Sequence, residues 1–215
     1  GAAAEIIEDQ RTTFLTEALT RKLAKRAQGI LSREIPRRKS EAPGRVKQRF
    51  LGAVTHQGPV CLYHTALSQC QRVYALADDC GLAHELLIRL LPGITENGYD
   101  VVACPDPMAP SRLSHLLIPQ LGLAFLTVSS GLPLDEKPYR RIRLDGMADG
   151  EAPGRSRPRL RFAKKVSAAL EEEAVSSLAQ AKAMHDELEA IYNPHVDFHR
   201  VDQMAQDVWR EILTF

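Results

Sequence analysis

The sequence predicts an α/β domain in which helices flank a mostly parallel sheet. From Phe50 onward, short apolar runs are broken by glycine and proline, which is typical of strands and turns. A strand-like segment at 73–77, a helical segment at 82–91 and a strand-like segment at 99–104 follow one another. A strand, helix, strand order of this length is typical of a βαβ unit, whose two strands run parallel.

The remaining strands follow from the same apolar runs. We predict strands at 50–54, 59–63, 73–77, 99–104, 116–118 and 121–128. The last of these is nearly all apolar, as expected for a central strand covered on both faces. The arginine-rich segment 139–144 predicts an edge strand. Pro92-Gly93 predicts the end of the helix at 82–91.

Helices are predicted at both ends of the chain. Apolar residues recur at three- and four-residue steps over 5–34, and again over about 161–192 and 198–213. We therefore expect an amphipathic helix and basic linker at 1–44, an α/β domain at 45–160, and C-terminal helices at 161–215 that pack on it.

Composition excludes several classes of protein. Hydrophobic residues make up 44% and charged residues 26% of the 215, which is typical of an ordinary soluble domain. No run of 18 apolar residues and no basic-then-apolar leader occurs, so we expect a cytoplasmic protein without a membrane partner. The four cysteines form no C-x-x-C pair, and His195 and His199 follow a helix-breaking Pro194, so we expect no metal site.

The charge of the chain is unevenly distributed. The whole chain carries a formal charge of only +1, but residues 50–135 hold three basic and seven acidic side chains. No lysine occurs between Lys47 and Lys137. The predicted α/β core is therefore a poor environment for a highly charged anion.

The loop after the strand at 73–77 is the first place to look for a ligand, because parallel sheets bind ligands beyond the carboxyl ends of their strands. This candidate loop consists of Ala77, Asp78, Asp79, Cys80, Gly81, Leu82, Ala83, His84 and Glu85. Taken alone, the loop does not indicate a nucleotide. A Cys80–His84 nucleophile is disfavoured, because two neighbouring carboxylates raise the pKa of that thiol and no third orienting group follows.

Several short motifs point to a particular family. They are RFLGA with GPV from Arg49, NGYDV from Asn97, LIPQLGLA from Leu117 and AKAMHDELE from Ala181. Together they resemble the second, C-terminal repeat of an uncharacterised bacterial family of tandem P-loop ATPase-like proteins. The resemblance covers roughly residues 45–215 and implies a P-loop NTPase-like fold. It also implies that the N-terminal helix is the end of a preceding repeat.

The nucleotide-binding positions of that family are not kept in this chain. The lysine of its P-loop falls on Ala83, two of its glycines on Cys80 and Leu82, and its Ser-Thr pair on His84-Glu85. In the second motif, Gln120 replaces a glutamate and Thr127 replaces the aspartate that would orient Mg²⁺. The loop Pro105-Asp106 likewise replaces a His-Cys pair of the family.

These losses predict a domain that does not hydrolyse ATP by itself, with no cofactor of its own. We expect it to act as the structural or regulatory half of an ATPase-like protein, beside a partner P-loop domain encoded upstream or acting in trans. One alternative is an ATP-binding protein whose phosphate contacts come from Arg112, Arg140, Arg141 and Arg143. Another is a nucleic-acid module that uses basic segments 33–49 and 136–165, which lack interleaved aromatic residues.

Overall fold

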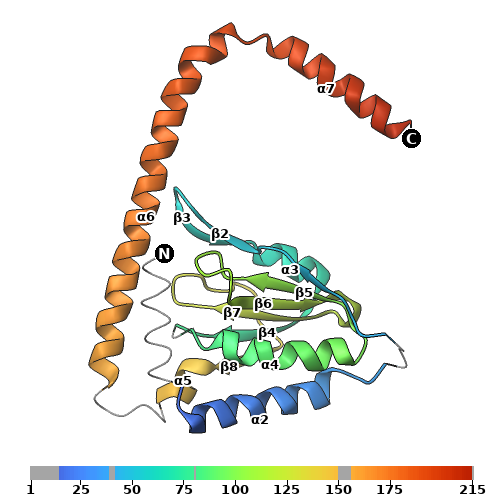
Figure 1. The fold of residues 1–215 in the computed structure, drawn as a ribbon, viewed down its shortest axis with the longest axis vertical. Helices are drawn as coiled ribbons and strands as arrows, with labels where there is room; N and C mark the ends of the chain where they lie inside the picture. The colour runs from blue at the N-terminus through green and yellow to red at the C-terminus, as the bar shows by residue number, and fades with distance from the viewer. Residues whose placement is uncertain (1–14, 39–41, 80, 150–155, 215) are drawn as a thin grey trace.

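A six-stranded mixed sheet forms the centre of the computed structural model, which describes residues 15–38, 42–79, 81–149 and 156–214 (Figure 1). The strand order is β1-β5-β6-β7-β4-β8. The strands are β1 (Val46–Gln48), β4 (Arg72–Ala77), β5 (Val101–Pro105), β6 (Leu113–Ile118), β7 (Leu123–Val128) and β8 (Arg140–Arg143).

All strands of this sheet except β6 run in the same direction. β4 pairs parallel to both β7 and β8, and β1 pairs parallel to β5, whereas β6 is antiparallel to both of its neighbours. The predicted βαβ unit is therefore present: along the chain, β4 is followed by α4 (Ala83–Glu96) and then by β5, and the two strands run in the same direction. The predicted central strand is β7, although it begins at Leu123, because Leu121 ends the short 3-10 helix η1 (Pro119–Leu121). The arginine-rich strand β8 is an edge strand, as expected.

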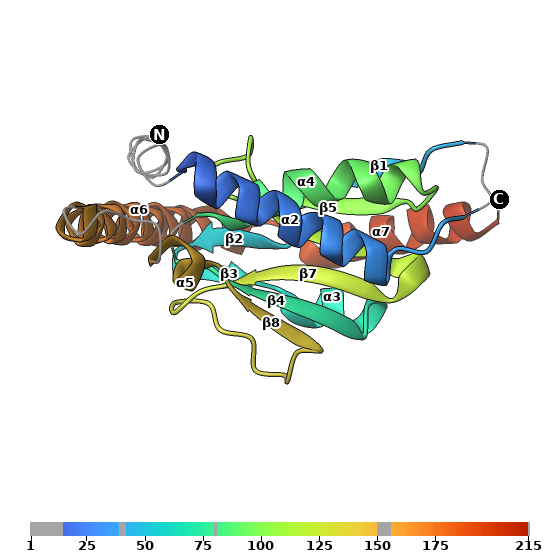
Figure 2. The same ribbon diagram turned by 90° about the horizontal axis from the view of Figure 1, so that it is seen from below.

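Helices α2 (Glu17–Glu34) and α4 cover one face of the sheet and lie side by side (Figure 2). Leu19, Leu23, Ala27 and Ile30, spaced by three or four residues, turn one stripe of α2 into the core, and each is at most 2% exposed. Burying a leucine or isoleucine in this way stabilises the fold by about 1.5–3 kcal/mol. The N-terminal helix is thus part of the core of the α/β domain, and its predicted residues 5–14 lie outside the described part of the chain.

A hairpin and a short helix cover the opposite face. β2 (Gly52–Thr55) and β3 (Gly58–Cys61) form a separate two-stranded antiparallel sheet, followed by α3 (Tyr63–Gln69). The predicted strand at 59–63 therefore ends early, because Tyr63 begins the helix. A smaller core of buried residues lies on this side and includes Leu51, Ala66, Cys70, Cys104 and Leu126.

We expected the helix α4 to end before Pro92, but it continues to Glu96. Proline removes one backbone donor, yet Leu90 and Ile94 on either side are fully buried and hold the helix against the core. The Thr95 hydroxyl group also donates to the carbonyl oxygens of Leu91 and Pro92, at 3.2 and 3.0 Å. Tertiary packing therefore outweighs the local helix-breaking signal.

The C-terminal helices form an arm rather than a cover for the domain. After α5 (Leu144–Asp149), α6 (Ser156–Tyr192) runs for 37 residues, about 55 Å, and contacts the hairpin strand β2. The 3-10 helix η2 (Asn193–His195) then leads to α7 (Phe198–Leu213), which stands apart from the sheet in Figure 1. We expected α7 to pack on the domain, but none of its residues is buried, because α6 carries it past the sheet. No helix in the described part of the chain is both long and apolar enough to cross a membrane.

Candidate functional site

The candidate loop lies beside a cavity of about 270 Å³ at the carboxyl ends of β4 and β7. The hairpin β2–β3 contributes one wall of this cavity, and Glu171 of α6 contributes to another. Its polar lining comes from the candidate loop, from the β5–β6 connection and from the strands, and includes Asp78, His84, Asp106, Arg112, His115 and Thr127. The topology thus places the loop where ligands bind in parallel sheets, as the sequence indicated.

The side chain of Asp78 closes the start of α4. It is buried, and its Oδ2 accepts a hydrogen bond of 2.6 Å from the backbone N–H of Ala83, the first residue of the helix. Gly81, at φ +75°, makes the turn between these residues, and the side chain of Leu82 is fully buried in the core. A carboxylate of the chain itself therefore occupies the N-terminal end of α4.

Asp79 ties the loop to the segment that follows β7. Its Oδ1 accepts hydrogen bonds from the backbone N–H and the hydroxyl group of Ser130, at 3.0 and 3.2 Å. Its own N–H donates to Oδ1 of Asp145, at the start of α5. Both aspartates of the loop thus serve as hydrogen-bond acceptors for the protein. Cys80 lies outside the described residues, so the predicted Cys80–His84 pair has no described geometry.

The remaining loop residues also contact the protein itself. Arg112 donates to the carbonyl oxygen of Gly81, and the N–H of Leu113 donates to Nδ1 of His84 at 2.9 Å. Glu85 is buried and forms an ion pair with Arg89 one turn later in α4, at 2.8 Å. These contacts attach the candidate loop to the β5–β6 connection.

The structure separates the two positions of the second motif. Thr127 lies next to Leu76 of β4, lines the cavity and donates its hydroxyl hydrogen to the carbonyl of Ser114. Gln120 lies in η1, before β7 begins, and its Oε1 accepts from the N–H of Asp100 at 3.0 Å. Gln120 is therefore at the far end of β7 from the candidate loop.

Only one of the four arginines considered as phosphate ligands lines the cavity, and it is Arg112. Arg140, Arg141 and Arg143 lie on the edge strand β8 and are exposed. Arg140 stacks over the ring of Tyr139 and pairs in register with Tyr74, toward the amino end of the strand. Among the described residues, the arginines of β8 are therefore not part of the cavity.

A cysteine–histidine pair that we did not predict lies in the cavity wall. Nε2 of His115, on β6, is 3.8 Å from Sγ of Cys61, on β3, and the ring of Tyr63 packs edge-on against the imidazole. Residues 54 positions apart carry no local sequence signal, so only the pairing of a hairpin with the sheet brings them together.

The protonation of this pair argues against a nucleophilic thiol. The N–H of Thr127 donates to Nδ1 of His115 at 3.1 Å, so a neutral ring carries its proton on Nε2, toward the sulfur. Burial lowers the pKa of His115 to about 4 and raises the pKa of Cys61 to about 11. Both groups are therefore neutral near pH 7. The ring nitrogen that faces the sulfur already carries a proton, so the histidine cannot accept the proton of the thiol.

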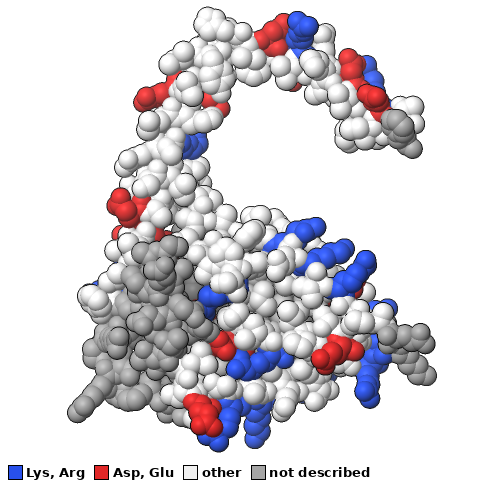
Figure 3. Space-filling view, in the orientation of Figure 1, with Lys and Arg blue, Asp and Glu red and all other residues white. Residues whose placement is uncertain are grey.

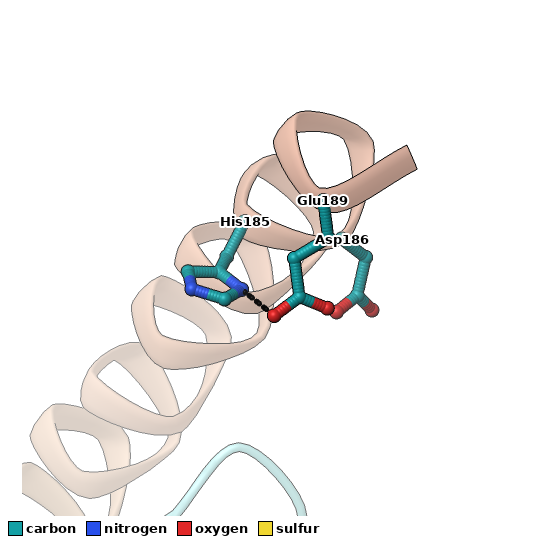
Figure 4. A group of neighbouring side chains, drawn as sticks. All are labelled: His185, Asp186 and Glu189. Carbon is teal, nitrogen blue, oxygen red and sulfur yellow. Dashed lines mark ion pairs between the residues drawn. The ribbon is translucent and has the colours of Figure 1, made fainter. Parts of the chain in front are cut away.

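A second cluster of polar groups lies on the exposed surface of α6 (Figure 4). His185 Nδ1 is 3.3 Å from Oε1 of Glu189, and Asp186 pairs with Lys182 at 2.6 Å. The hydrogen bond and the charge of Lys182 lower the pKa of Asp186. These are side-chain pairs one turn apart on a helix surface, which explains the cluster without a metal ion.

Comparison with known proteins identifies no relative. No protein-family model matches the chain, and no similar curated protein or solved structure was found. The resemblance to tandem P-loop ATPase-like proteins therefore stays a prediction from the sequence motifs.

Proposed function

We propose that this chain is a P-loop NTPase-fold domain that does not hydrolyse ATP itself and acts as the structural or regulatory half of an ATPase-like protein. One contact carries the proposal, the hydrogen bond from the Ala83 N–H to the Asp78 carboxylate. In a phosphate-binding loop, the N–H groups that begin the helix stay available for the phosphates. Here a negative group of the protein is already held at that position.

The charges around the cavity support the same conclusion. Asp78, Asp106 and Glu171 contribute carboxylates to its lining, whereas Arg112 is the one arginine among the described lining residues. That guanidinium group donates to the carbonyl of Gly81 within the loop. A triphosphate would bring further negative charge to this site without a lysine to balance it, and the sequence has none between Lys47 and Lys137.

The position of β7 supports the NTPase-like part of the proposal. The strand that resembles the second motif lies directly beside the strand that leads into the loop, in parallel register. Thr127 lines the cavity, and in the family that the sequence resembles an aspartate at this position would orient Mg²⁺. A hydroxyl group cannot supply the negative charge that a Mg²⁺ site of this kind uses.

Calorimetry with Mg-ATP and Mg-GTP tests the loss of nucleotide binding. We expect no binding heat at nucleotide concentrations up to the millimolar range and no phosphate release. Micromolar binding, with turnover that Asp78→Ala abolishes, would contradict the proposal. Asp207→Ala on α7 is the matched control, since it removes an exposed carboxylate remote from the loop.

The structural or regulatory role needs a separate measurement. We expect this chain to bind a P-loop domain with an intact G-x-x-x-x-G-K-[ST] sequence, encoded upstream or acting in trans, and to change its rate of ATP hydrolysis. Co-elution of the two proteins and phosphate release with and without this chain measure both effects. A P-loop domain that neither co-elutes nor changes its turnover would count against this role.

A further inference from the structure

Helix α7 presents an apolar stripe, and none of the residues of this helix is buried. Val201, Met204, Ala205, Val208, Trp209 and Ile212 line a shallow groove along the helix. Trp209 and Met204 are each 62% exposed. Most polar side chains of the helix lie on its other side, so the pattern is that of a helix with one buried face.

A helix of this length needs a partner to be stable. α7 has 16 residues, and isolated helices of about that length are marginal in water. Most of the stability of a helix in a protein comes from the packing of its apolar face. None of its residues is buried, so the described part of the chain supplies no surface that would stabilise α7 in this way.

The exposed apolar surface of α7, which includes the stripe and the two ends of the helix, is as large as a protein interface. Seven large apolar residues of α7 are 52–67% exposed, namely Phe198, Val201, Met204, Val208, Trp209, Ile212 and Leu213. At roughly 100 Å² each, they present on the order of 700 Å². The largest apolar patch of a typical monomer covers about 300–600 Å², and a stable interface buries about 800 Å² from each partner.

Exposed apolar residues also occur on α6, before the turn at η2. Met184, Leu188 and Ile191 follow one another at steps of four and three residues, and each is more than half exposed. The exposed apolar surface of the arm therefore exceeds that of α7 alone.

The charges of α7 favour protein over lipid or nucleic acid. Two arginines, Arg200 and Arg210, stand against three carboxylates, those of Asp202, Asp207 and Glu211. A helix that binds anionic membranes or nucleic acid carries an excess of basic residues on its polar face. Figure 3 shows both acidic and basic groups on α7, so this helix has no excess of positive charge that would attract a polyanion.

We propose that the arm, made of α6 and α7, is a dimerisation element that packs against the same stripe of a second copy of this chain. A two-fold interface of this kind is self-complementary, so each apolar stripe covers the other. This inference goes beyond the proposed function and is independent of whether the candidate loop binds a nucleotide.

Sedimentation velocity of the whole chain over about 1–100 μM tests the proposal. We expect a species of twice the 23.9 kDa chain mass that dissociates on dilution. Val208→Glu, which places a carboxylate in the stripe, should raise the dimer dissociation constant by about 10- to 100-fold. Gln203→Glu adds the same charge on the opposite side of the helix and should leave the dissociation constant within about threefold.

The single tryptophan of the chain gives a second readout. Trp209 lies in the stripe, so its emission should shift to longer wavelength as the dimer dissociates. Because α7 does not contribute to the domain core, both variants should keep the unfolding midpoint of the α/β domain, which separates loss of dimer from loss of fold. A wild-type chain that is monomeric at 100 μM, or equal dissociation constants for the two variants, would overturn the proposal.

Discussion

The hydroxyl group of Tyr74 donates a hydrogen bond of 2.6 Å to Oε1 of Glu34, and this contact joins the middle of β4 to the last residue of α2. Oε2 of the same carboxylate accepts from Nη1 of Arg72 at 3.0 Å. The Glu34 side chain is only 5% exposed, so both of its oxygens are satisfied within the protein. Burial and then the contact with Glu34 raise the pKa of Tyr74 to about 12.

We expect Tyr74→Phe to lower the free energy of unfolding by about 1–3 kcal/mol, because it leaves one oxygen of a buried carboxylate without its donor. Urea denaturation followed by circular dichroism measures this change. Tyr192→Phe removes a hydroxyl group from a side chain of α6 that is 42% exposed, and should change the stability by less than about 0.5 kcal/mol. Equal stability of the two variants would show that the buried contact contributes nothing.

Gly44 is required by the close approach of the chain to Tyr99. A methyl group at this position would lie 1.8 Å from the carbonyl oxygen of Tyr99, which is backbone and has little freedom to move. The N–H of Gly44 also donates to the carbonyl of Thr95 at 2.8 Å. We expect Gly44→Ala to destabilise the fold by about 2–4 kcal/mol, measured as a drop in the thermal midpoint. Gly131→Ala enters open space and should be close to neutral; a similar drop in both variants would argue against this explanation.

Acid should destabilise the protein through His115. Burial lowers the pKa of this histidine from 6.5 to about 4, so between these values the unfolded chain binds a proton that the folded chain does not. Stability is therefore complete above pH 6.5 and falls as the pH drops toward 4, by at most about 3 kcal/mol.

Urea unfolding at pH 7 and pH 5 tests this expectation. The difference in stability between the two pH values should shrink in His115→Gln, whatever that change costs at pH 7. His195→Gln, in an exposed position of η2, should keep the wild-type difference. If His115→Gln keeps it as well, another group is responsible for the acid sensitivity.

The thiol of Cys61 should react slowly in the folded protein. With its pKa raised to about 11, its thiolate fraction at pH 8 is more than 100-fold below that of a free cysteine. Alkylation at pH 8, mapped to Cys61 by mass spectrometry, should accelerate by at least that factor in denaturant. Rapid alkylation of the native protein at pH 6–8 would instead indicate a thiolate–imidazolium pair with His115.

Local patterns in the sequence account for five of the six strands of the central sheet and for the position of the candidate loop, but not for β1. The continuous apolar run of β7 predicts a central strand because both faces of such a strand are covered, and β7 lies between β6 and β4. The alternation of strand, helix and strand around residues 77–85 places the loop at the carboxyl edge of the sheet. The missing lysine and the acidic residues of the loop are also evident without coordinates.

Contacts between distant segments follow only from the tertiary structure. The sequence by itself determined that Asp78 lies in a loop between a strand and a helix, because that depends on residues within one turn or strand. Packing decided that its carboxylate holds the N–H of Ala83, that α4 continues past Pro92, and that Cys61 meets His115 across 54 residues. An amphipathic stripe shows that α7 has a face to bury, but the pattern is the same whether that face meets its own domain or another molecule. Only the path of α6 past the sheet shows that α7 finds no cover within the described part of this chain.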